Sequence, residues 1–291
     1  MPRLVLLCLA IALIAAGCGE AVDAGGESID DDEFIDEPTV AEDLADEVCD
    51  PDLVGDEDGP VESIYTIDDG ALAGLCWGDP DETVTGAFEL LELVAGPDQL
   101  RDVAYVGGFN GGADTLAFVV PVDDDYSSFV IAIDTVAAVD DPNELRLTLL
   151  HEFAHVLTQR NDELDLDGDP LACSTHWNGI GCFVPGSYVD SWVQAFWPED
   201  ELRTLPTDGV DQAAGEERCA IDPSFLGAYA ASDPEEDFAE SFSGFVFGLD
   251  VPDAVQPRLE FFAEYPELRA MRERAFDEGL APQANTFDRC G

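Results

Sequence analysis

The chain has 291 residues, 46% of them hydrophobic, which is enough for one large domain or two small ones with a true core. It contains 65 aspartates and glutamates but only 11 arginines and no lysine, so the formal net charge is −54. A protein this negative repels nucleic acids and anionic lipid headgroups, so the charge argues strongly against both as partners. A saline habitat, in which salt screens the repulsion, and a GC-rich genome are alternative explanations of the acidity.

Residues 1–17 have the form of an export signal. Arg3 precedes an apolar run over residues 4–16 that is too short to span a bilayer as a mature helix. The sequence Ala15-Ala16-Gly17-Cys18 resembles the bacterial lipobox, in which small residues precede a cysteine that is diacylated and becomes the mature N-terminus. We therefore expect an exported lipoprotein, anchored through Cys18 to the outer face of the cell membrane and touching the membrane through this lipid only. The alternative is an ordinary secreted protein.

Residues 18–38 are acidic and poor in large apolar side chains, which predicts a disordered tether on the lipidated cysteine. Val40, Leu44 and Val48 then recur at helical spacing. We expect the folded domain to comprise residues 39–291.

Six cysteines follow the tether, and an even number in an exported chain favours disulfides. Chain order suggests Cys49 with Cys76, Cys173 with Cys182, and Cys219 with Cys290. Six cysteines allow about 15 pairings, and the short loop from Cys173 to Cys182 is the best supported of the three. A rival interpretation is a second zinc site formed by Cys173, His176 and Cys182.

Short segments rich in β-branched and aromatic residues predict sheet strands at 102–106, 115–122 and 128–134. Residues 61–67 and 88–94 give mixed signals, and the latter segment suits either a buried strand or a short helix. We expect residues 128–133 to form the edge strand on which an extended peptide substrate would pair.

The sequence His151-Glu152-Phe153-Ala154-His155 follows directly, within a predicted helix over 142–159 that begins with the capping residue Asp141 and a proline. Histidines at i and i+4 lie on one helix face, where two imidazoles can hold one cation. Glu152 is rotated off that face and can reach a water beside the metal as a general base. The pentapeptide therefore predicts a catalytic zinc site.

Residues 160–220 are predicted to be an insertion. Asp165, Asp167 and Asp169 alternate around a glycine as in calcium loops, but no glutamate stands at the twelfth loop position, so a solvated acidic turn is the alternative. The aromatic side chains that follow suit a core or the wall of a cleft; they are Trp177, Trp192, Phe196 and Trp197.

A catalytic zinc requires a third protein ligand. Thr158 and Asn161 stand where a metzincin needs glycine and histidine, which excludes that class. His176 is one candidate for the ligand. We favour a second capped helix that begins near residue 234, on which Glu236 and Glu240 share a face among apolar residues.

With these two helices the chain resembles the gluzincin metallopeptidases, in particular the group that includes the protease domain of anthrax lethal factor and bacterial zinc-binding lipoproteins. The resemblance covers about residues 145–160 and 225–245 and rests on the His-Glu-Phe-Ala-His and Glu-Asp-Phe-Ala-Glu segments. It implies that Glu236 is the third ligand, that Glu240 is a supporting acid one turn on, and that the Tyr229 hydroxyl steadies the oxyanion. The interval from His151 to Glu236 exceeds the usual gluzincin interval because of the insertion.

The resemblance further implies an α+β, zincin-like fold, in which a small mixed sheet packs on the histidine helix and the C-terminal half is mainly helical. The expected activity is that of an exported, lipid-anchored, zinc-dependent endopeptidase that hydrolyses peptide bonds of a peptide or protein substrate with a metal-activated water. The alternative is a noncatalytic zinc-binding surface lipoprotein that acts as a binding module.

Overall fold

The computed structural model describes residues 49–54, 59–111, 115–203, 205, 210–284, 287, 289 and 290. The predicted signal peptide, Cys18, the tether and the helical repeat over 40–48 lie outside the described residues. Within the described part of the chain, no helix is both long enough and apolar enough to cross a membrane.

A five-stranded mixed sheet forms the N-terminal part of the domain. Its strands are β1 Val61–Asp68, β2 Ala71–Gly78, β3 Val103–Phe109, β4 Ala117–Pro121 and β5 Phe129–Asp134. They lie in the order β2-β1-β3-β5-β4, in which β3 and β5 are parallel and the other neighbours are antiparallel. The pair β6 Leu164–Asp165 and β7 Cys182–Phe183 forms a separate ribbon.

The position of β5 corrects one prediction. Residues 128–133 were expected at the edge of the sheet, but β5 lies between β3 and β4, and all six of its residues are buried. An uninterrupted apolar run is typical of an interior strand that is covered on both faces, whereas an edge strand that faces solvent alternates. The edge strands of this sheet are β2 and β4.

The helices account for most of the remaining described chain. They are α1 Glu82–Ala95, α2 Ala137–Asp140, α3 Pro142–Gln159, α4 Tyr188–Phe196, α5 Glu199–Leu202, α6 Gln212–Cys219, α7 Pro234–Val246, α8 Gln256–Phe261 and α9 Pro266–Asp277. Short 3-10 turns lie at Pro51–Leu53, Pro97–Gln99, Ala230–Ser232 and Phe262–Glu264. The mixed α/β composition and the helical C-terminal half agree with the predicted class.

Helix α3 has the predicted bounds because its first turn is fixed locally. The Asp141 carboxylate accepts hydrogen bonds from the backbone N–H groups of Asn143 and Glu144, and Pro142 occupies the first helical position. The ambiguous segment 88–94 belongs to α1, which Asp81 caps in the same way. The segment 61–67 belongs to β1.

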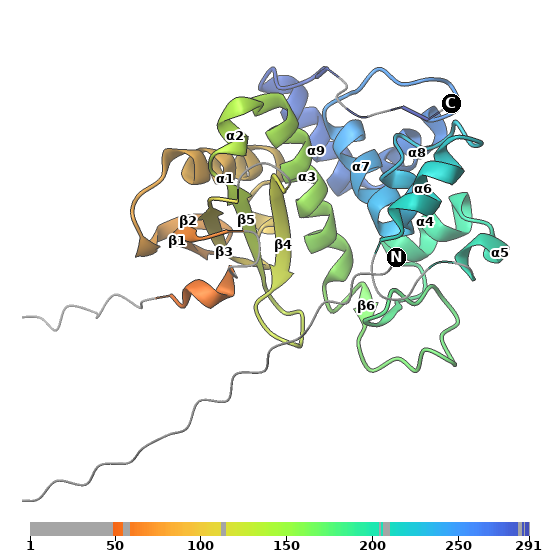
Figure 1. The fold of residues 1–291 in the computed structure, drawn as a ribbon, viewed down its shortest axis with the longest axis horizontal. Coiled ribbons are helices and arrows are strands. Elements are labelled where there is room, and N and C mark those ends of the chain that lie inside the picture. Colours follow the sequence, from red (N-terminus) through yellow and green to blue (C-terminus); the bar gives the residue numbers. More distant parts are fainter. Residues whose placement is uncertain are drawn as a thin grey trace, which may run out of the picture. The chain divides into compact units, whose positions relative to one another are not determined.

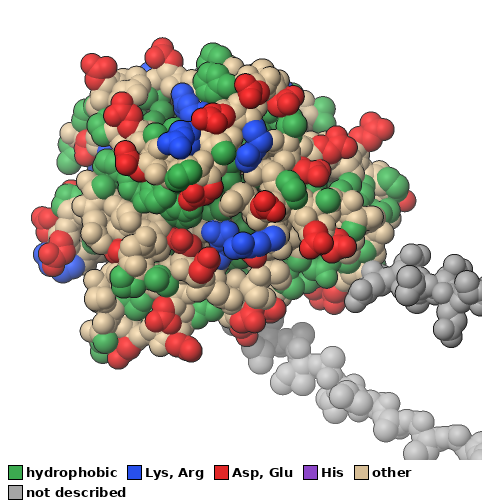
Figure 2. All heavy atoms as spheres, turned by 180° about the vertical axis from the view of Figure 1, so that it is seen from behind, with side chains coloured by type: hydrophobic (Ala, Val, Ile, Leu, Met, Phe, Trp, Pro, Cys, Tyr) green, Lys and Arg blue, Asp and Glu red, His purple; other side chains and the backbone are tan. Residues whose placement is uncertain are grey.

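Helix α3 lies between the sheet and the C-terminal helices (Figure 1). Its side chains Leu149, Leu150 and Phe153 are fully buried in the main core, which also contains Phe129 of β5 and Phe238 of α7. A smaller apolar cluster covers the other face of the sheet. Acidic side chains are spread over the face in Figure 2, among few arginines, so the charge is carried on the surface.

The three disulfides pair as predicted: Cys49 with Cys76, Cys173 with Cys182, and Cys219 with Cys290. The second bond closes the loop that precedes β7. The rival zinc site is therefore wrong, because Cys173 and Cys182 are bonded to each other and offer no thiolate to a metal.

Candidate metal centre

His151 and His155 project from the same face of α3, one turn apart, and both are 8% exposed. Their Nε2 atoms lie 3.2 Å from each other. The i,i+4 spacing thus brings two donor atoms to one point, as the helix geometry requires.

The third donor comes from α7. Asp233 caps this helix by accepting a hydrogen bond from the backbone N–H of Glu235, and Pro234 holds the first helical position. This start directs Glu236 toward α3, where its Oε2 lies 3.0 Å from Nε2 of His151 and 3.5 Å from Nε2 of His155.

These three residues form the one group of donors among the described residues that could hold a metal ion, with all donor atoms within 4.8 Å of one another. Donors held by one tetrahedral zinc at about 2.0 to 2.1 Å would lie roughly 3.3 Å apart, and the observed separations bracket that value. Two imidazoles and one carboxylate also match the donor chemistry of catalytic zinc sites. The residues therefore fit a zinc ion.

The electrostatics of the group favour positive charge at its centre. Burial alone would lower the pKa of His155, but the charge of Glu236 and their hydrogen bond raise it to about 10. Burial alone would raise the pKa of Glu236, but the charge of His155 and hydrogen bonds from both imidazoles hold it well below its usual range. A divalent cation would supply the positive charge that this carboxylate attracts.

Glu152 follows His151 on α3 and lies within reach of the edge strand β4. Burial raises the pKa of its carboxyl group, while the two histidines oppose the shift. The carboxylate accepts a hydrogen bond from the backbone N–H of Val119. This contact orients Glu152 beside the metal-binding group without making it a member of that group.

Tyr229 lies in the segment before α7. Its ring centroid is 5.9 Å from that of His151, and its hydroxyl lies close enough to Glu236 for the carboxylate to act on its pKa. Burial raises the pKa of its hydroxyl, and the charges of Glu236 and Glu152 raise it further, so the hydroxyl keeps its proton at neutral pH. The residue is nevertheless 43% exposed, so it borders the site from the solvent side.

Glu240 lies one turn beyond Glu236 and is 5% exposed. It is not one of the three clustered donors. Its carboxylate accepts a hydrogen bond from the backbone N–H of Ala230, and burial, with the nearby charges of Glu236 and Asp237, raises its pKa well above the usual value. Glu240 is therefore a buried acid next to the ligand Glu236 and not a ligand itself.

His176, the other candidate ligand, is not in the cluster. Its ring stacks on Phe183 with centroids 6.1 Å apart, and burial lowers its pKa to about 4. It does line a small cavity of about 130 Å³ that His155 and Glu236 also line. His176 is therefore a neutral wall residue near the metal-binding group.

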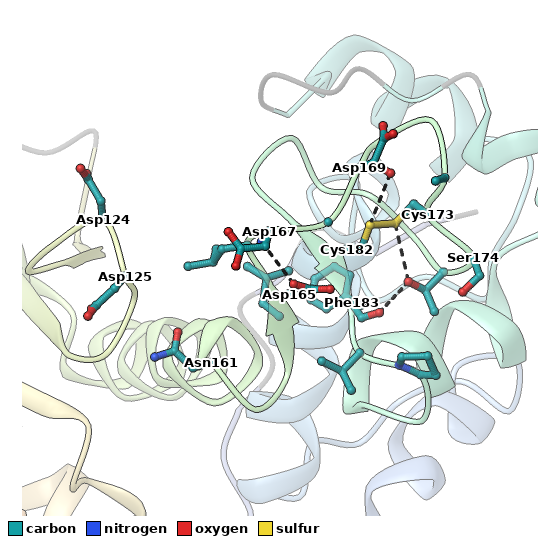
Figure 3. A pocket seen from close by; sticks show the side chains of 17 residues that line it. Asp124, Asp125, Asn161, Asp165, Asp167, Asp169, Cys173, Ser174, Cys182 and Phe183 are labelled. Carbon is teal, nitrogen blue, oxygen red and sulfur yellow. Dashed lines mark hydrogen bonds between the residues drawn. A yellow bond between two sulfur atoms is a disulfide. The ribbon is translucent and has the colours of Figure 1, made fainter.

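The predicted calcium ligands do not converge. Asp165 accepts a hydrogen bond from the backbone N–H of Asp167, and Asp169 accepts one from that of Leu171, as in ordinary acidic turns. With Asp124 and Asp125, which come from the turn between β4 and β5, they line a cavity of about 870 Å³. Asp124 and Asp125 lie on one side of this cavity, and Asp165, Asp167 and Asp169 lie on the opposite side (Figure 3). Nothing here supports bound calcium.

One buried network next to the ligand was not predicted. Asp237 follows Glu236 on α7 and accepts hydrogen bonds from the indole N–H groups of Trp192 and Trp197, at 3.1 and 2.9 Å. The Arg258 guanidinium donates to the same carboxylate at 3.0 Å, and both charged side chains are almost fully buried. The tryptophans were noted only as wall or core, because the sequence carries no signal that joins them to Asp237.

No family model and no curated protein matches the chain. Among solved structures, it is similar to the crystal structure of a "putative zinc-binding metallo-peptidase" from Bacteroides caccae ATCC 43185. The two share 16% sequence identity over 67% of this chain and 73% of that chain, with a TM-score of 0.37. A likeness of this degree assigns neither a family nor an activity to the chain.

Proposed function

We propose that this protein is a zinc-dependent endopeptidase with a zincin-like arrangement of sheet, metal-binding helix and ligand helix. The observation that carries the proposal is the convergence of His151, His155 and Glu236 within 4.8 Å, with Glu152 beside them. This is the combination of three ligands and one free acid that metal-assisted peptide hydrolysis needs.

In the proposed mechanism, a zinc ion held by the three ligands would polarise the scissile carbonyl and lower the pKa of a coordinated water. Glu152 accepts the proton of the attacking water and later returns it to the leaving amine. Burial raises its pKa, which brings this carboxyl closer to the value that suits a general base near neutral pH. The protonated Tyr229 hydroxyl donates a hydrogen bond to the carbonyl oxygen as negative charge develops there.

The edge strand β4 offers a backbone partner for an extended substrate. Backbone hydrogen bonds at Leu116 and Val122 go to β5 or to the turn before it, so the alternating residues Ala117 and Val119 face the open edge. The backbone N–H of Val119 is close enough to Glu152 to act on its carboxyl group, so this edge lies near the proposed base. A peptide paired along β4 would therefore pass beside the catalytic group.

Export and lipid anchoring at Cys18 are part of the same proposal and rest on the N-terminal sequence. They place the enzyme outside the membrane, where disulfides form. The membrane contact in this proposal is the lipid alone.

Three substitutions test the activity. Glu236→Ala removes a ligand, so zinc content and cleavage of an unfolded protein should fall together. Glu152→Gln keeps the ligands, so zinc should stay bound while the cleavage rate drops by about 10² to 10⁴. Tyr229→Phe should keep zinc and lose less activity than Glu152→Gln.

The matched control is Glu273→Ala, a side chain 70% exposed on α9, which should change neither property. Zinc content is measured by elemental analysis of the purified protein. Full activity in Glu152→Gln would reject Glu152 as the general base, whereas absence of cleavage by the zinc-loaded unsubstituted protein would leave a zinc-binding module. Full zinc in Glu236→Ala would reassign the third ligand.

A further inference from the structure

The small cavity of about 130 Å³ beside the metal-binding group is polar, and we call it the His155 cavity. His155 and Glu236 form one part of its lining. The other polar side chains that line it are Gln159, His176, Asn178, Asp233 and Glu235. Because His176 and Asn178 belong to the insertion, a segment outside α3 and α7 reaches a proposed zinc ligand.

His155 uses only one of its ring nitrogens in the metal-binding group. Its Nε2 lies 3.5 Å from Oε2 of Glu236, whereas its buried Nδ1 has no hydrogen-bond partner among the described residues. An imidazole that binds zinc through Nε2 carries its proton on Nδ1, and this N–H almost always donates to a carboxylate, a backbone carbonyl or a water. The His155 cavity is where the structure has room for that acceptor.

Two carboxylates besides Glu236 line the His155 cavity, and they have different partners. Asp233 accepts the backbone N–H of Glu235 at 2.8 Å and so caps α7. Glu235 accepts the amide of Gln159, one turn beyond His155 on α3, at 3.4 Å. Burial lowers the pKa of His155, and the charges that oppose this shift include that of Glu236 and, more weakly, that of Glu235. Glu235 is therefore the carboxylate available to this side of the ring.

Asn178 adds a donor with a fixed direction. Its Oδ1 accepts the backbone N–H groups of Ile180 and Gly181 at 3.1 and 3.0 Å, which sets the plane of the amide. Its Nδ2 is buried and forms no hydrogen bond of normal length in the part of the chain that the structure describes. Burial raises the pKa of Glu235 to about 7, and the Asn178 amide is near enough to oppose that rise. The free donor thus lies toward Glu235.

One water molecule in the His155 cavity would satisfy these groups together. The N–H groups of His155 and Asn178 are two donors, and the carboxylate of Glu235 is an acceptor. A buried water makes about three hydrogen bonds and needs roughly 10 to 15 Å³ of such space. The cavity therefore has both the volume and the set of polar partners that a buried water requires.

We propose that Glu235 and Asn178 are positioning residues that hold His155 in its metal-binding orientation through a buried water. The inference rests on the zinc site of the proposed function and extends that site into the insertion. Asn178 lies in the loop that the disulfide of Cys173 with Cys182 closes, so this disulfide supports the metal centre.

The first experiment measures the zinc Kd of the full chain by competition with a chromogenic chelator. Glu235→Asp keeps the charge but withdraws the carboxylate by one methylene, so the Kd should rise about 10-fold or more. Glu273→Asp makes the same change at a side chain 70% exposed on α9 and should leave the Kd unaltered. A carboxylate that acted by charge alone would give Glu235→Asp an unaltered Kd as well, which would overturn the proposal.

The second variant lies on a different element. Asn178→Ser keeps an oxygen that can accept the N–H of Ile180 but removes the donor that faces the cavity, so the Kd should again rise about 10-fold. Because both side chains act through one water, combining Asn178→Ser with Glu235→Asp should add less than about 3-fold to the larger single effect. Independent effects would multiply to about 100-fold and overturn the shared water. Asn143→Ser, at an exposed position on α3, is the control.

The proton on Nδ1 offers a readout that does not depend on affinity. The chain has three histidines, so the zinc-loaded protein labelled with ¹⁵N-histidine gives few NMR signals. The Nδ1–H of His155 should exchange slowly with solvent, and Asn178→Ser should accelerate this exchange. Rapid exchange in the unsubstituted protein would overturn the proposal.

The disulfide is tested by replacing both of its cysteines. Cys173→Ser with Cys182→Ser should raise the zinc Kd about 3-fold or more, because Asn178 is then held less firmly. Cys49→Ser with Cys76→Ser opens the disulfide at β2 and should leave the Kd unaltered. Equal Kd values in the two double variants would reject the role of the insertion disulfide.

These measurements separate the positioning proposal from the proposed function. Cleavage with a zinc Kd that does not depend on Glu235 or Asn178 overturns the positioning role and leaves the hydrolytic function standing. A Kd that depends on both residues, without cleavage by the unsubstituted protein, overturns the function and supports the positioning role. A chain that binds no zinc defeats both.

Discussion

His151 and Glu152 are consecutive residues with different partners, and the helix explains the difference. Successive residues on an α-helix are rotated by about 100°, so neighbours cannot face the same element. His151 meets Glu236 of α7, whereas Glu152 meets the Val119 backbone of β4. One peptide unit thus separates a proposed ligand from a proposed base.

His176 gives a prediction about pH. Burial lowers its pKa from 6.5 to about 4, so the unfolded chain takes up a proton before the folded chain does as the pH falls. The stability that the neutral imidazole contributes is complete above pH 6.5 and is lost as the pH falls toward 4. Between pH 7 and 4.5 we expect this residue alone to cost about 2 kcal/mol of unfolding free energy.

The measurement is urea unfolding of the zinc-free chain at both pH values, compared with His176→Gln. The variant has no titratable group at position 176. Its unfolding free energy should therefore fall by about 2 kcal/mol less than that of the unsubstituted chain between pH 7 and 4.5. Equal losses in the two proteins would show that His176 does not titrate in this way.

At the scale of elements, α7 connects the insertion to the metal-binding group. Glu236 faces α3, while Asp237 is held from the other side by Trp192 and Trp197 of the insertion and by Arg258 of α8. A buried ion pair whose carboxylate is fully hydrogen-bonded fixes orientation more than it adds stability. The network therefore connects the insertion and α8 directly to the helix that carries Glu236.

The edge strand yields a second prediction. Ala117→Pro removes one N–H that faces the open edge of β4 and leaves the hydrogen bonds to β5 intact, a position where proline is tolerated. If substrate pairs with this edge, KM should rise roughly 3- to 10-fold, the worth of one hydrogen bond, with zinc content unchanged. Peptide kinetics together with metal analysis check this outcome. An unaltered KM would mean that substrate does not use this N–H.

At the scale of the whole molecule, the disulfides close loops of very different lengths. Cys219 and Cys290 enclose a separation of 71 residues, whereas Cys173 and Cys182 enclose one of 9. Because a longer loop restricts the unfolded chain more, replacing the first pair by serine should cost about 4 kcal/mol and replacing the second about 2.5 kcal/mol. Chemical unfolding of the two double variants measures the loss of unfolding free energy in each. A larger loss for the Cys173 and Cys182 pair than for the Cys219 and Cys290 pair would refute the loop-length argument.

The N-terminal proposal predicts a change of compartment. Cys18→Ala removes the proposed acylation site, so the mature chain should move from the detergent phase to the soluble exported fraction. Detergent partitioning of whole-cell protein measures this change. Unchanged partitioning of the variant would reject lipid anchoring at Cys18.

Local signals account for what could be predicted of the fold. Asp141 and Pro142 fixed the start of α3, and the strand segments were found because β-branched runs between turn residues favour extended chain. The edge position of β5 was predicted wrongly, although its uninterrupted apolar run is typical of an interior strand. Which strands lie beside it depends on pairing between segments that are distant in sequence.

The sequence by itself determined the histidine pair and the glutamate beside it, since both depend on spacing along one helix. The disulfide partners were suggested by chain order, and the structure decided them among the possible pairings. Only the tertiary structure decided between Glu236 and His176, because these residues stand on different elements and their distance from α3 is set by packing of α7 against it. Packing of β4 against α3 likewise decided which part of the chain lies near Glu152. Such contacts arise where several buried surfaces meet, and no single segment of the chain specifies them.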